Sequence, residues 1–456
     1  MRAPFQKGDR LTLTPERLGA RGEAEAVHEG WRVRIPGGFP GETATVTIEH
    51  VSKGGPMAVA RYESAAAPHA ARRDAPCPIH DTCGGCGLQG FGEAAVLAEK
   101  VRNVRPLLPE APWLDPIPSP LAFGYRSKTF MLPQAREWKL VLGARPPRGP
   151  DLVDTSGCNV LRPELEALAA VTRSVLSERF AGKRLPLSEP ADDRPGLRAA
   201  LLRCNRSGGT QITLVHRGPD DGLFEEAARA VAQTGAAAAA FLQRHDGPGN
   251  RICSDENERL VAGEGPLRER FEAGRATVEV AIPPTAFFQG NPEVAESLYA
   301  LAAGAVAGLR IAELYCGAGV AGLLALHLQT EGELRGVDKA PRAVASALES
   351  ARGNDVADRC RFEVGSAEEL LPRWVADGAR FDALLLNPPR GGCHPDVLAA
   401  ASSSGASRLA YMSCNPETLG RDADALVGDG WRVESLQPAD MFPQTPHLEV
   451  LALFAR

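Results

Sequence analysis

The sequence lacks the long apolar segments that insertion into a membrane requires. No apolar run approaches the roughly 20 residues that a helix needs to cross a bilayer, and the N-terminus has no apolar core of the kind found in secretory signals. We therefore expect a cytoplasmic protein with no membrane partner. Because thiols stay reduced in the cytoplasm, clustered cysteines are expected to bind a metal or to take part in catalysis rather than to form disulfides.

The sequence also lacks the net positive charge that is typical of nucleic-acid-binding proteins. Its formal net charge is -6 at pH 7. The average hides an asymmetry, because residues 1–150 carry 20 Lys and Arg against 15 Asp and Glu, whereas the remainder carries 31 against 42. This asymmetry fits an N-terminal part that binds a polyanion, followed by an acidic catalytic part. Simple drift in composition gives the same numbers.

Length and patterning indicate several domains. The chain has 456 residues, of which 44% are hydrophobic and 24% charged, as in ordinary globular proteins. This length gives room for about two to four domains. The patterns described below divide the chain into parts at 1–63, 64–119, 120–290 and 291–456.

Residues 6–62 contain short runs in which apolar and polar residues alternate, at 10–14, 31–35, 44–48 and 57–62. Such period-two patterning, with glycines between the runs, predicts a small β-barrel. The size is near that of OB-like folds, which commonly bind single-stranded nucleic acid. A β-module with a purely structural role fits the same pattern.

A cysteine cluster follows the predicted barrel. Cys77, Cys83 and Cys86 lie within ten residues, and Gly84-Gly85 separates the last two. Because glycine lets the backbone turn tightly, these thiolates can surround one ion or cluster, with Cys158 as the candidate fourth ligand. Four thiolates satisfy zinc as well as an iron–sulfur cluster, and a redox pair at Cys83 and Cys86 or unligated thiols remain alternatives.

Residues 120–290 predict an α+β segment built mostly of antiparallel strands. The strands 199–204 and 210–215 are expected to form a hairpin around Ser207-Gly208-Gly209. A helix at 224–231 and a returning strand at 238–242 are expected to follow. Residues 124–128 are basic and include an aromatic side chain, which suits contact with RNA. An exposed hairpin edge explains these residues equally well.

From about residue 309 the sequence alternates between strand-like and helix-like segments. The expected strands are 311–314, 334–337, 361–364, 381–386, 408–412, 431–436 and 448–454, and the expected helices include 294–307, 341–354, 367–376 and 396–402. Repeated βα units predict a right-handed, doubly wound parallel sheet of about seven strands. The fold class of this part is therefore α/β.

A glycine-rich loop after the first of these strands indicates a nucleotide cofactor. Residues 317–322 match Gly-x-Gly-x-x-Gly, and Asp338 follows the second glycine by 19 residues, as in dinucleotide-binding folds. Two neighbours favour S-adenosylmethionine instead. Glu313 stands just before the loop, where methyltransferases commonly carry an acid that interacts with the methionine end, and a rigid Asn-Pro-Pro-Arg turn begins at Asn387. A nicotinamide cofactor remains the alternative.

Cys414 is the candidate nucleophile. Residues 409–412 form an apolar strand, and Pro416 can begin a helix but cannot lie inside one. A thiol between a strand end and a helix N-terminus lies where open α/β sheets bind ligands, and the helix favours its thiolate form. A buried cysteine in the core is the alternative, because free cysteines are commonly buried.

Together these motifs resemble those of one family, the RNA 5-methyluridine methyltransferases that carry a TRAM domain and an iron–sulfur cluster. Besides the cysteines and the glycine loop, the matching motifs are Phe-x-Gln-x-Asn at 287–291, Ser-Cys-Asn-Pro at 413–416 and the C-terminal His447-Leu448-Glu449. The similarity spans nearly the whole chain, and the motifs are specific in combination.

The resemblance implies a fold and a set of binding residues. Residues 1–63 are expected to form a TRAM, OB-like RNA-binding barrel, 64–119 with Cys158 the iron–sulfur site, 120–290 a central α+β RNA-binding domain, and 291–456 a Rossmann-like methyltransferase domain. The implied ligands of a four-iron four-sulfur cluster are Cys77, Cys83, Cys86 and Cys158. The implied S-adenosylmethionine-binding residues are Gln289, Tyr315, Asp338 and Asn387, with Glu313 and Ser366 as further candidates.

The family's reaction is methylation of uridine at C5 in structured RNA. We expect ribosomal RNA rather than transfer RNA as substrate, and a monomeric enzyme that needs no protein partner. Uracil C5 is too weak a nucleophile to attack a sulfonium methyl group directly, so addition of the Cys414 thiolate at C6 must first make it electron-rich. Glu449 is the expected base that removes the C5 proton. The uracil has to leave any base stack to reach these groups.

Two positions depart from the family pattern. Asn387 and Glu313 stand where aspartate is usual. A carboxylate only accepts hydrogen bonds, whereas the Asn387 amide can also donate one, for example to cytosine N3. The alternatives are therefore an RNA-binding or chaperone protein of the same fold, with weakened catalysis or a cytidine target, and a nicotinamide-dependent oxidoreductase that uses residues 317–322.

Overall fold

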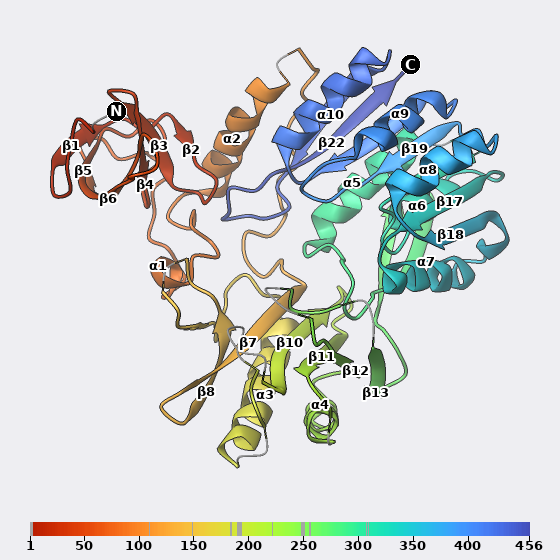
Figure 1. Ribbon diagram of the computed structural model, residues 1–456, viewed down its shortest axis with the longest axis horizontal. Helices are drawn as coiled ribbons and strands as arrows, with labels where there is room; N and C mark the ends of the chain where they lie inside the picture. The colour runs from red at the N-terminus through yellow and green to blue at the C-terminus, as the bar shows by residue number, and fades with distance from the viewer. Residues whose placement is uncertain are drawn as a thin grey trace.

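The computed structural model describes residues 3–456 apart from 109, 148, 183–184, 189–193, 221, 248–250, 255–256, 307 and 309. The described chain forms a small N-terminal lobe, a central lobe and a larger C-terminal lobe, as Figure 1 shows. Both of the larger lobes are built on a seven-stranded sheet. Within the described residues, no helix is long and apolar enough to cross a membrane.

The N-terminal lobe is a six-stranded sheet. Its strands are β1 (Arg10–Leu13), β2 (Arg17–Leu18), β3 (Ala24–His28), β4 (Trp31–Ile35), β5 (Ala44–Val51) and β6 (Met57–Ala65), in the spatial order β1-β5-β6-β4-β3-β2. The runs predicted from alternation are confirmed as strands, and their apolar side chains share one core. Patterning missed β3 because Glu25 is buried there, bound by the guanidinium groups of Arg17 and Arg34.

An ion pair and two aromatic rings fasten this lobe to the segment that follows it. Glu42 is fully buried, and its carboxylate accepts hydrogen bonds from Arg72 at 2.6 and 2.8 Å. The Arg72 guanidinium lies over the rings of Tyr62 and Phe91, at 4.6 and 4.7 Å from their centroids. A bidentate ion pair between two rings favours a single placement of the N-terminal lobe.

The segment between the first two lobes runs along the C-terminal lobe. After α1 (His80–Cys83), helix α2 (Glu93–Val104) places Leu97 and Val101 in a core of that lobe, and Figure 1 shows α2 between it and the N-terminal lobe. A short turn η1 (Arg105–Leu107) follows. Trp113 and Ile117 then pair with the edge strand β21 (Arg432–Ala439). Residues 88–117 are therefore part of the packing of the C-terminal lobe.

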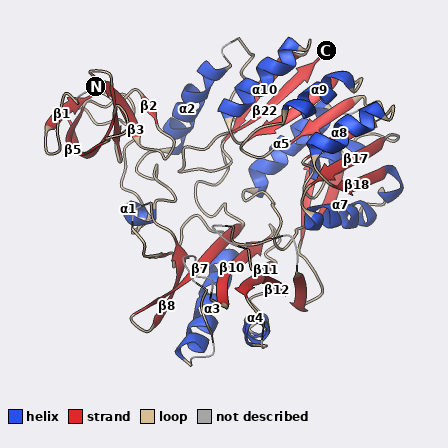
Figure 2. Ribbon diagram, in the orientation of Figure 1, coloured by secondary structure: helices blue, strands red, loops and turns tan. Residues whose placement is uncertain are grey.

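The central lobe is a seven-stranded sheet with two helices on one face, as Figure 2 shows. Its strands, in the spatial order β13-β12-β11-β10-β7-β8-β9, are β7 (Lys128–Arg136), β8 (Lys139–Ala144), β9 (Val153–Asp154), β10 (Gly196–Cys204), β11 (Thr210–Arg217), β12 (Ala239–Arg244) and β13 (Glu258–Ala262). The predicted hairpin, helix and returning strand are confirmed as β10–β11, α4 (Leu223–Gln233) and β12. The strand pairs are antiparallel except β11 and β12.

Helix α3 (Pro163–Ala181), which has 19 residues and lies in the central lobe, was not predicted from the sequence. Its buried residues follow helical spacing, at Leu165, Leu168, Ala169, Thr172 and Leu176. The signal was therefore present in the sequence as an apolar stripe that begins after a proline at the first helical position. The stripe packs with α4 on the core of the sheet.

The C-terminal lobe is the predicted seven-stranded α/β sheet. Its strands, in the spatial order β18-β17-β16-β19-β20-β22-β21, are β16 (Arg310–Leu314), β17 (Glu333–Asp338), β18 (Cys360–Val364), β19 (Ala383–Leu386), β20 (Arg408–Ser413), β21 and β22 (Glu449–Ala455). Its helices are α5 (Pro292–Ala305), α6 (Val320–His327), α7 (Pro341–Gly353), α8 (Ala367–Ala376), α9 (Pro395–Ser403) and α10 (Pro416–Gly428). The predicted strands and helices are confirmed, and residue 307 of the predicted helix 294–307 lies outside the described residues.

Helices pack on both faces of this sheet, as a doubly wound fold requires. Consecutive residues of one strand enter different cores, since Ile311 packs with α5, α6 and α7 and Ala312 with α8, α9 and α10. A hairpin of β14 (Arg268–Ala273) and β15 (Ala276–Ala281) joins the first of these cores. Because both faces are covered, the strands read as nearly continuous apolar runs.

One strand corrects the prediction of a parallel sheet. β22 runs antiparallel to both of its neighbours, β20 and β21, whereas the other neighbouring pairs are parallel. The reason is the connection, because the loop 440–448 joins β21 to β22 without a crossover helix. The sheet is therefore mixed, and β22 begins at the edge where the parallel strands end.

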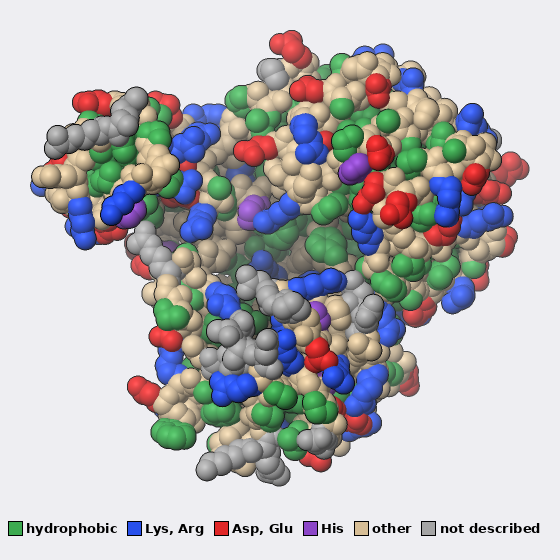
Figure 3. All heavy atoms as spheres, viewed as in Figure 1, with side chains coloured by type: hydrophobic (Ala, Val, Ile, Leu, Met, Phe, Trp, Pro, Cys, Tyr) green, Lys and Arg blue, Asp and Glu red, His purple; other side chains and the backbone are tan. Residues whose placement is uncertain are grey.

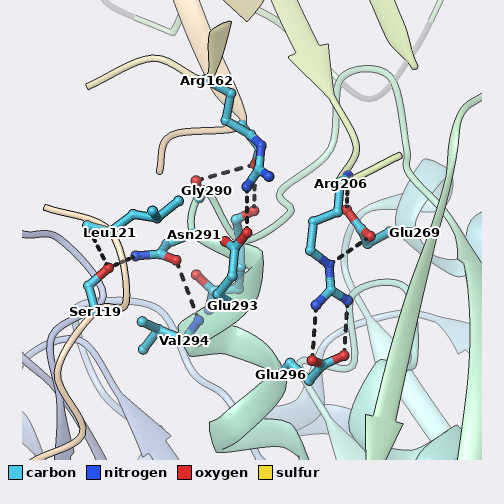
Figure 4. A network of polar contacts seen from close by, with 12 residues as sticks. Ser119, Leu121, Arg162, Arg206, Glu269, Gly290, Asn291, Glu293, Val294 and Glu296 are labelled. Carbon is cyan, nitrogen blue, oxygen red and sulfur yellow. Dashed lines mark hydrogen bonds and ion pairs between the residues drawn. The ribbon is translucent and has the colours of Figure 1, made fainter. Parts of the chain in front are cut away.

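Charged side chains join α5 to the central lobe, as Figure 4 shows. Arg162, which precedes α3, donates a hydrogen bond to Glu293 at 2.6 Å. Arg206, in the turn between β10 and β11, binds Glu269 at 3.0 Å and Glu296 at 2.9 Å. These contacts hold the first turns of α5 against the central lobe, so this helix fixes the two larger lobes relative to each other.

Candidate active site

Four predicted site residues meet at one edge of the C-terminal sheet. Tyr315, Asn387 and Cys414 directly follow β16, β19 and β20, and Asp338 ends β17. These four strands are neighbours in the order β17-β16-β19-β20. The edge formed by the carboxyl ends of parallel strands is where open α/β sheets bind ligands. The structure therefore brings the candidate cofactor residues and the candidate nucleophile together.

Glu449 reaches the same edge because β22 is antiparallel. Ser413 pairs with Val450, which places the first residue of β22 beside Cys414. The Glu449 side chain is 3% exposed, and its carboxylate makes no hydrogen bond within the part of the chain that the structure describes. Burial raises the pKa of Glu449 to about 8, against the opposing effect of the Arg390 charge. A buried carboxyl that makes no hydrogen bond and lies next to a thiol has the properties of a general base.

Burial and two nearby charged groups act on the thiol of Cys414. Burial raises its pKa, and the nearby Glu449 carboxylate raises it further. Arg390 lowers the same pKa, because its guanidinium charge lies within hydrogen-bonding reach of the sulfur. Sequence reasoning named Arg390 only as the end of the turn that begins at Asn387. Its partnership with Cys414 and Glu449 depends on the fold and has no local signal.

The helix after the nucleophile fixes the Asn-Pro-Pro-Arg turn. Asn415 is the N-cap of α10, and its side-chain oxygen accepts a hydrogen bond from the Glu417 backbone at 3.2 Å. The Asn415 amide nitrogen donates to the Arg390 carbonyl oxygen at 2.9 Å, and the Thr418 hydroxyl donates to the same oxygen at 3.4 Å. One asparagine therefore begins the helix and orients the turn that presents Arg390.

A buried network supports this edge from within the lobe. Asp422 is 1% exposed, and its carboxylate accepts hydrogen bonds from the Tyr411 hydroxyl and the Cys393 backbone, both at 2.7 Å. Tyr315 also contacts Cys393 through its hydroxyl. The network connects β20, α10 and the residue that follows β16. Of these groups, sequence reasoning assigned a role only to Tyr315, because only the fold brings the others together.

The glycine loop adopts a left-handed backbone. Gly317 and Gly319 have φ of 56° and 76°, and Tyr315 has φ of 57° although it carries a large side chain. Such a conformation is rare for residues other than glycine and is found at functional sites. Asp338 accepts hydrogen bonds from the backbone nitrogens of Gly317 and Ala340, both at 2.9 Å. The acid and the loop are therefore held as one unit.

The two further cofactor candidates lie in different places. Glu313 is buried behind the glycine loop, where a Cβ atom at Gly322 would collide with its carboxylate. Burial raises the pKa of Glu313 to about 8, against the opposing effect of the Gly322 backbone N–H. Ser366 is the N-cap of α8, and the preceding Gly365 donates a backbone hydrogen bond to Asp338 at 3.0 Å. Ser366 thus joins the edge, whereas Glu313 lies beneath it.

The three defined residues of the Phe-x-Gln-x-Asn motif lie in different environments. Asn291 is fully buried, caps α5 by accepting from the Val294 nitrogen at 3.4 Å, and donates to Ser119 at 3.0 Å, as Figure 4 shows. Phe287 is 64% exposed. Gln289 is buried, and its side-chain amide makes no hydrogen bond within the described residues. The motif therefore presents an amide that is free to bind a ligand.

The four predicted cluster cysteines lie near one another. The thiols of Cys83 and Cys158 raise the pKa of Cys86, which burial raises to about 11. The Asn159 amide donates to the carbonyl oxygen of residue 76 at 3.3 Å, which brings the neighbour of Cys158 beside that of Cys77. Within the described residues, no three His, Cys, Asp or Glu side chains have the arrangement of a metal site. Partly buried thiols that oppose each other's ionisation are nevertheless a donor set that fits a cation.

Comparison with known proteins identifies the family. A family model described as tRNA (Uracil-5-)-methyltransferase matches residues 249–456. The chain is also 31% identical, over 464 residues, to an uncharacterized RNA methyltransferase of Gloeobacter violaceus, and the match covers 99% of this chain and 97% of the relative. The chain belongs to the uracil-5 RNA methyltransferase family.

Another relative and a solved structure are also similar to this chain. An uncharacterized RNA methyltransferase of Bacillus cereus is 28% identical over 473 residues, which cover 99% of this chain and 98% of the relative. The crystal structure of a Pyrococcus abyssi tRNA (uracil-54, C5)-methyltransferase with S-adenosyl-L-homocysteine matches with a TM-score of 0.75 and 23% identity, over 98% of this chain and 100% of the other. The predicted family and its α/β fold are confirmed. Membership favours S-adenosylmethionine over a nicotinamide cofactor.

Proposed function

We propose that this uracil-5 RNA methyltransferase methylates C5 of a uridine in structured RNA through a covalent bond between Cys414 and the base. The proposal rests on the register of β20 and β22, in which Glu449 lies beside Cys414. A nucleophile and a buried base at one ligand-binding edge are the two groups that this chemistry needs. The Glu449 carboxylate is available for this task, because it makes no hydrogen bond within the described residues.

The first step belongs to Cys414. Its thiolate adds to C6 of the uracil, and the electron pair displaced from the C5–C6 bond makes C5 nucleophilic. Arg390 favours the thiolate, because it lies within hydrogen-bonding reach of the sulfur. S-adenosylmethionine, when bound, supplies an electrophilic methyl group. The residues that would hold this cofactor are Gln289, Tyr315, Asp338, Ser366 and Asn387, with Glu313 supporting the glycine loop from beneath.

The last step belongs to Glu449. Its carboxylate takes the proton from the methylated C5, the C5–H electron pair restores the C5–C6 double bond, and the C6–S bond breaks to return the Cys414 thiolate. A base whose pKa is raised to about 8 by burial accepts a carbon-bound proton better than an exposed glutamate does. Burial also keeps water away from the intermediate.

Structured RNA is the proposed substrate, with ribosomal RNA ahead of transfer RNA. Figure 3 shows a hollow between the central and C-terminal lobes with Lys and Arg side chains along its margin, which suits a polyanion. The Pyrococcus abyssi relative is named as a transfer-RNA enzyme. Mass spectrometry of both RNA pools from a deletion strain decides between them, because one methyl group should be missing from ribosomal RNA alone.

We further propose that the first lobe, within 1–63, is a TRAM RNA-binding barrel and that Cys77, Cys83, Cys86 and Cys158 bind a four-iron four-sulfur cluster with a structural role. The division of the chain at 63, 119 and 290 belongs to the same proposal. Loss of brown colour and of bound iron in a Cys83→Ser protein is the expected result. Zinc in place of iron in the purified wild-type protein would contradict the cluster.

A cytidine target is the second candidate, and Asn387 is the observation that favours it. Its side chain makes no hydrogen bond within the described residues, and an amide can donate to N3 of cytosine. We rank uridine first because the family model describes uracil as the substrate base. If Asn387→Asp protein lost activity on cytidine RNA and gained activity on uridine RNA, cytidine would become the first candidate for the target of the wild-type enzyme.

The test of the main proposal is a trapped complex. In 5-fluorouridine RNA the C5 fluorine cannot be removed as a proton, so the covalent complex should persist after methyl transfer. We expect wild type to form a complex stable to denaturation and Cys414→Ala to form none. Cys360→Ala, which changes a buried cysteine in β18, is the matched control and should behave as wild type. Equal complex formation by Cys414→Ala and wild type would overturn the mechanism.

A further inference from the structure

The loop 440–448 begins and ends beside the proposed base. Ala439 of β21 pairs with Glu449 of β22, so the loop closes directly onto this residue pair. Within the loop, Gln444 has a left-handed φ of 67°, which is unusual for a residue other than glycine. A loop held in such a conformation needs contacts from outside to maintain it.

Those contacts come mostly from residues 88–125, which precede the methyltransferase sheet by nearly two hundred residues. The Lys100 ammonium, from α2, donates to the Asp440 carboxylate at 2.7 Å and to the Phe442 carbonyl oxygen at 3.0 Å. The Lys100 side chain is 0% exposed and that of Asp440 is 5% exposed. A buried ammonium that binds a carboxylate and a carbonyl oxygen fixes both groups.

Three further bonds fasten the middle of the loop. The Leu88 backbone donates to the Gln444 carbonyl oxygen at 3.0 Å, and the Gln444 amide donates to Glu93 at 3.1 Å. The Tyr125 hydroxyl donates to the carbonyl oxygen of residue 443 at 3.2 Å. The loop is therefore attached along its length to the segment between the first two lobes.

A short chain of contacts connects Lys100 to the base. The Phe442 carbonyl oxygen that Lys100 binds also accepts a hydrogen bond from the Thr445 hydroxyl at 2.8 Å, and Thr445 in turn accepts one from the His447 backbone at 3.3 Å. The Phe442 ring meets the His447 ring edge-on, with centroids 6.4 Å apart. His447 stands two residues before Glu449, and the charges of Arg390 and Lys100 both act on it.

We propose that Lys100 is a positioning residue for Glu449, and that α2 thereby controls the step in which the enzyme is released from the methylated RNA. The inference rests on the proposed function and deepens it. In that step the carboxylate takes the C5 proton, the C5–C6 double bond forms, and the C6–S bond breaks. Cys414 follows β20 and does not depend on the loop, so addition and methyl transfer should survive a change at Lys100.

The test compares the rate at which the covalent bond between Cys414 and the RNA forms with the rate at which the methylated RNA is released. Lys100→Met protein is mixed with S-adenosylmethionine and a mixture of unmodified ribosomal and transfer RNA transcripts. We expect single-turnover methyl transfer close to that of wild type, a turnover rate about ten- to a hundredfold lower, and accumulation of a covalent complex on denaturing gels. If Lys100 only stabilised the fold, the substitution would lower the rates of methyl transfer and of release together, and no covalent complex would accumulate.

Two variants complete the design. Glu449→Gln removes the base and should accumulate the complex fully. Arg34→Met is the matched control, because it also takes a cation from a buried carboxylate, that of Glu25, within the N-terminal lobe. This control should lose stability without accumulating the complex. If Glu449→Gln forms no complex, the proposed function fails. If Glu449→Gln forms it and folded Lys100→Met does not, the positioning role of Lys100 fails while the function stands.

A milder change keeps the inference testable if Lys100→Met does not fold. Tyr125→Phe removes only the hydroxyl that binds the carbonyl oxygen of residue 443 and keeps the ring. We expect a folded protein that accumulates the complex to a smaller extent, with an unchanged KM for RNA. Release at the wild-type rate by this protein would overturn the claim that the segment 88–125 sets the position of Glu449.

Discussion

Glu449 and Cys414 are both held in their protonated forms by burial. The pKa of Glu449 is raised to about 8 and that of Cys414 lies above its ordinary value, to which the Glu449 charge contributes. Arg390 opposes both effects. Groups this close lose their protons as a pair, so their titration belongs to the site rather than to either residue.

The first prediction concerns pH. Because both groups react as anions, kcat/KM should rise as pH increases through about 8, with little activity one to two units below that value. Arg390→Met removes the charge that favours both anions, so it should move this rise to higher pH. The measurement is kcat/KM for methyl transfer at a series of pH values, with Arg390→Lys as the control that keeps the charge. A profile that is flat across this range in wild type would contradict the assignment.

Glu313 provides the second prediction, which concerns stability. Its pKa is raised from 4.5 to about 8 in the folded protein, so the folded state binds a proton that the unfolded state releases between these values. The stability that this proton contributes is therefore lost progressively as pH rises from about 4.5 to about 8, at about 1.4 kcal/mol per pH unit. Glu313→Gln, which cannot ionise, should gain thermal stability relative to wild type as pH rises toward 8. A constant difference in Tm over this interval would contradict the buried, protonated state.

Single residues also show where sequence reasoning ends. Cys414 and Glu449 could be named from their motifs because each follows or begins a strand within a recognisable pattern. The position of Glu313 could not, since its place beneath α6 depends on the lack of a side chain at Gly322. The pairing of Lys100 with Asp440 could not either, because the two residues are 340 positions apart.

At the scale of elements, the direction of β22 decides whether there is an active site. The sequence predicted all seven strands, but period and composition say nothing about direction. If β22 ran parallel to β20, Glu449 would lie at the opposite edge of the sheet from Cys414. The antiparallel register, with Ser413 opposite Val450, brings the base to the nucleophile. The signal in the sequence was the lack of helical periodicity between β21 and β22.

The third prediction belongs to the start of α10. Asn415→Asp keeps an oxygen that can cap the helix but loses the amide that donates to Arg390, whereas Asn415→Ala loses both. Asn415→Ala should lower the free energy of unfolding by about 1 kcal/mol, and Asn415→Asp should cost only a small part of that. Both should slow formation of the complex with 5-fluorouridine RNA, because Arg390 is no longer oriented. If Asn415→Asp formed the complex with 5-fluorouridine RNA at the wild-type rate, Asn415 would act only as the cap of α10 and not by orienting Arg390.

At the scale of the whole molecule, α5 holds the central and C-terminal lobes together. Arg206 binds Glu269, which is 3% exposed, and Glu296 on α5, while Arg162 binds Glu293 one turn earlier. None of these pairs could be foreseen from patterns, because the partners come from elements far apart in the chain. The lobes themselves could be foreseen, since each has its own periodicity.

The fourth prediction tests this junction. Arg206→Met leaves the Glu269 carboxylate buried without its charged partner, which costs about 3 kcal/mol or more in comparable cases. We expect calorimetry to resolve separate unfolding of the two larger lobes in this variant, with wild type unfolding in one transition. Arg270→Met, which changes the exposed neighbour of Glu269, is the control and should unfold as wild type does. A single transition at the wild-type temperature in Arg206→Met would contradict the role given to this contact.

The most direct test of the central claim is the chemical identity of the bond between enzyme and RNA. Glu449→Gln protein, incubated with S-adenosylmethionine and unmodified RNA, should retain a complex that can be digested and mapped by mass spectrometry. We predict a peptide that contains Cys414 joined to a uridine that already carries its methyl group. A bond to any other cysteine, or transfer of the methyl group with no covalent complex at any time, would contradict the account.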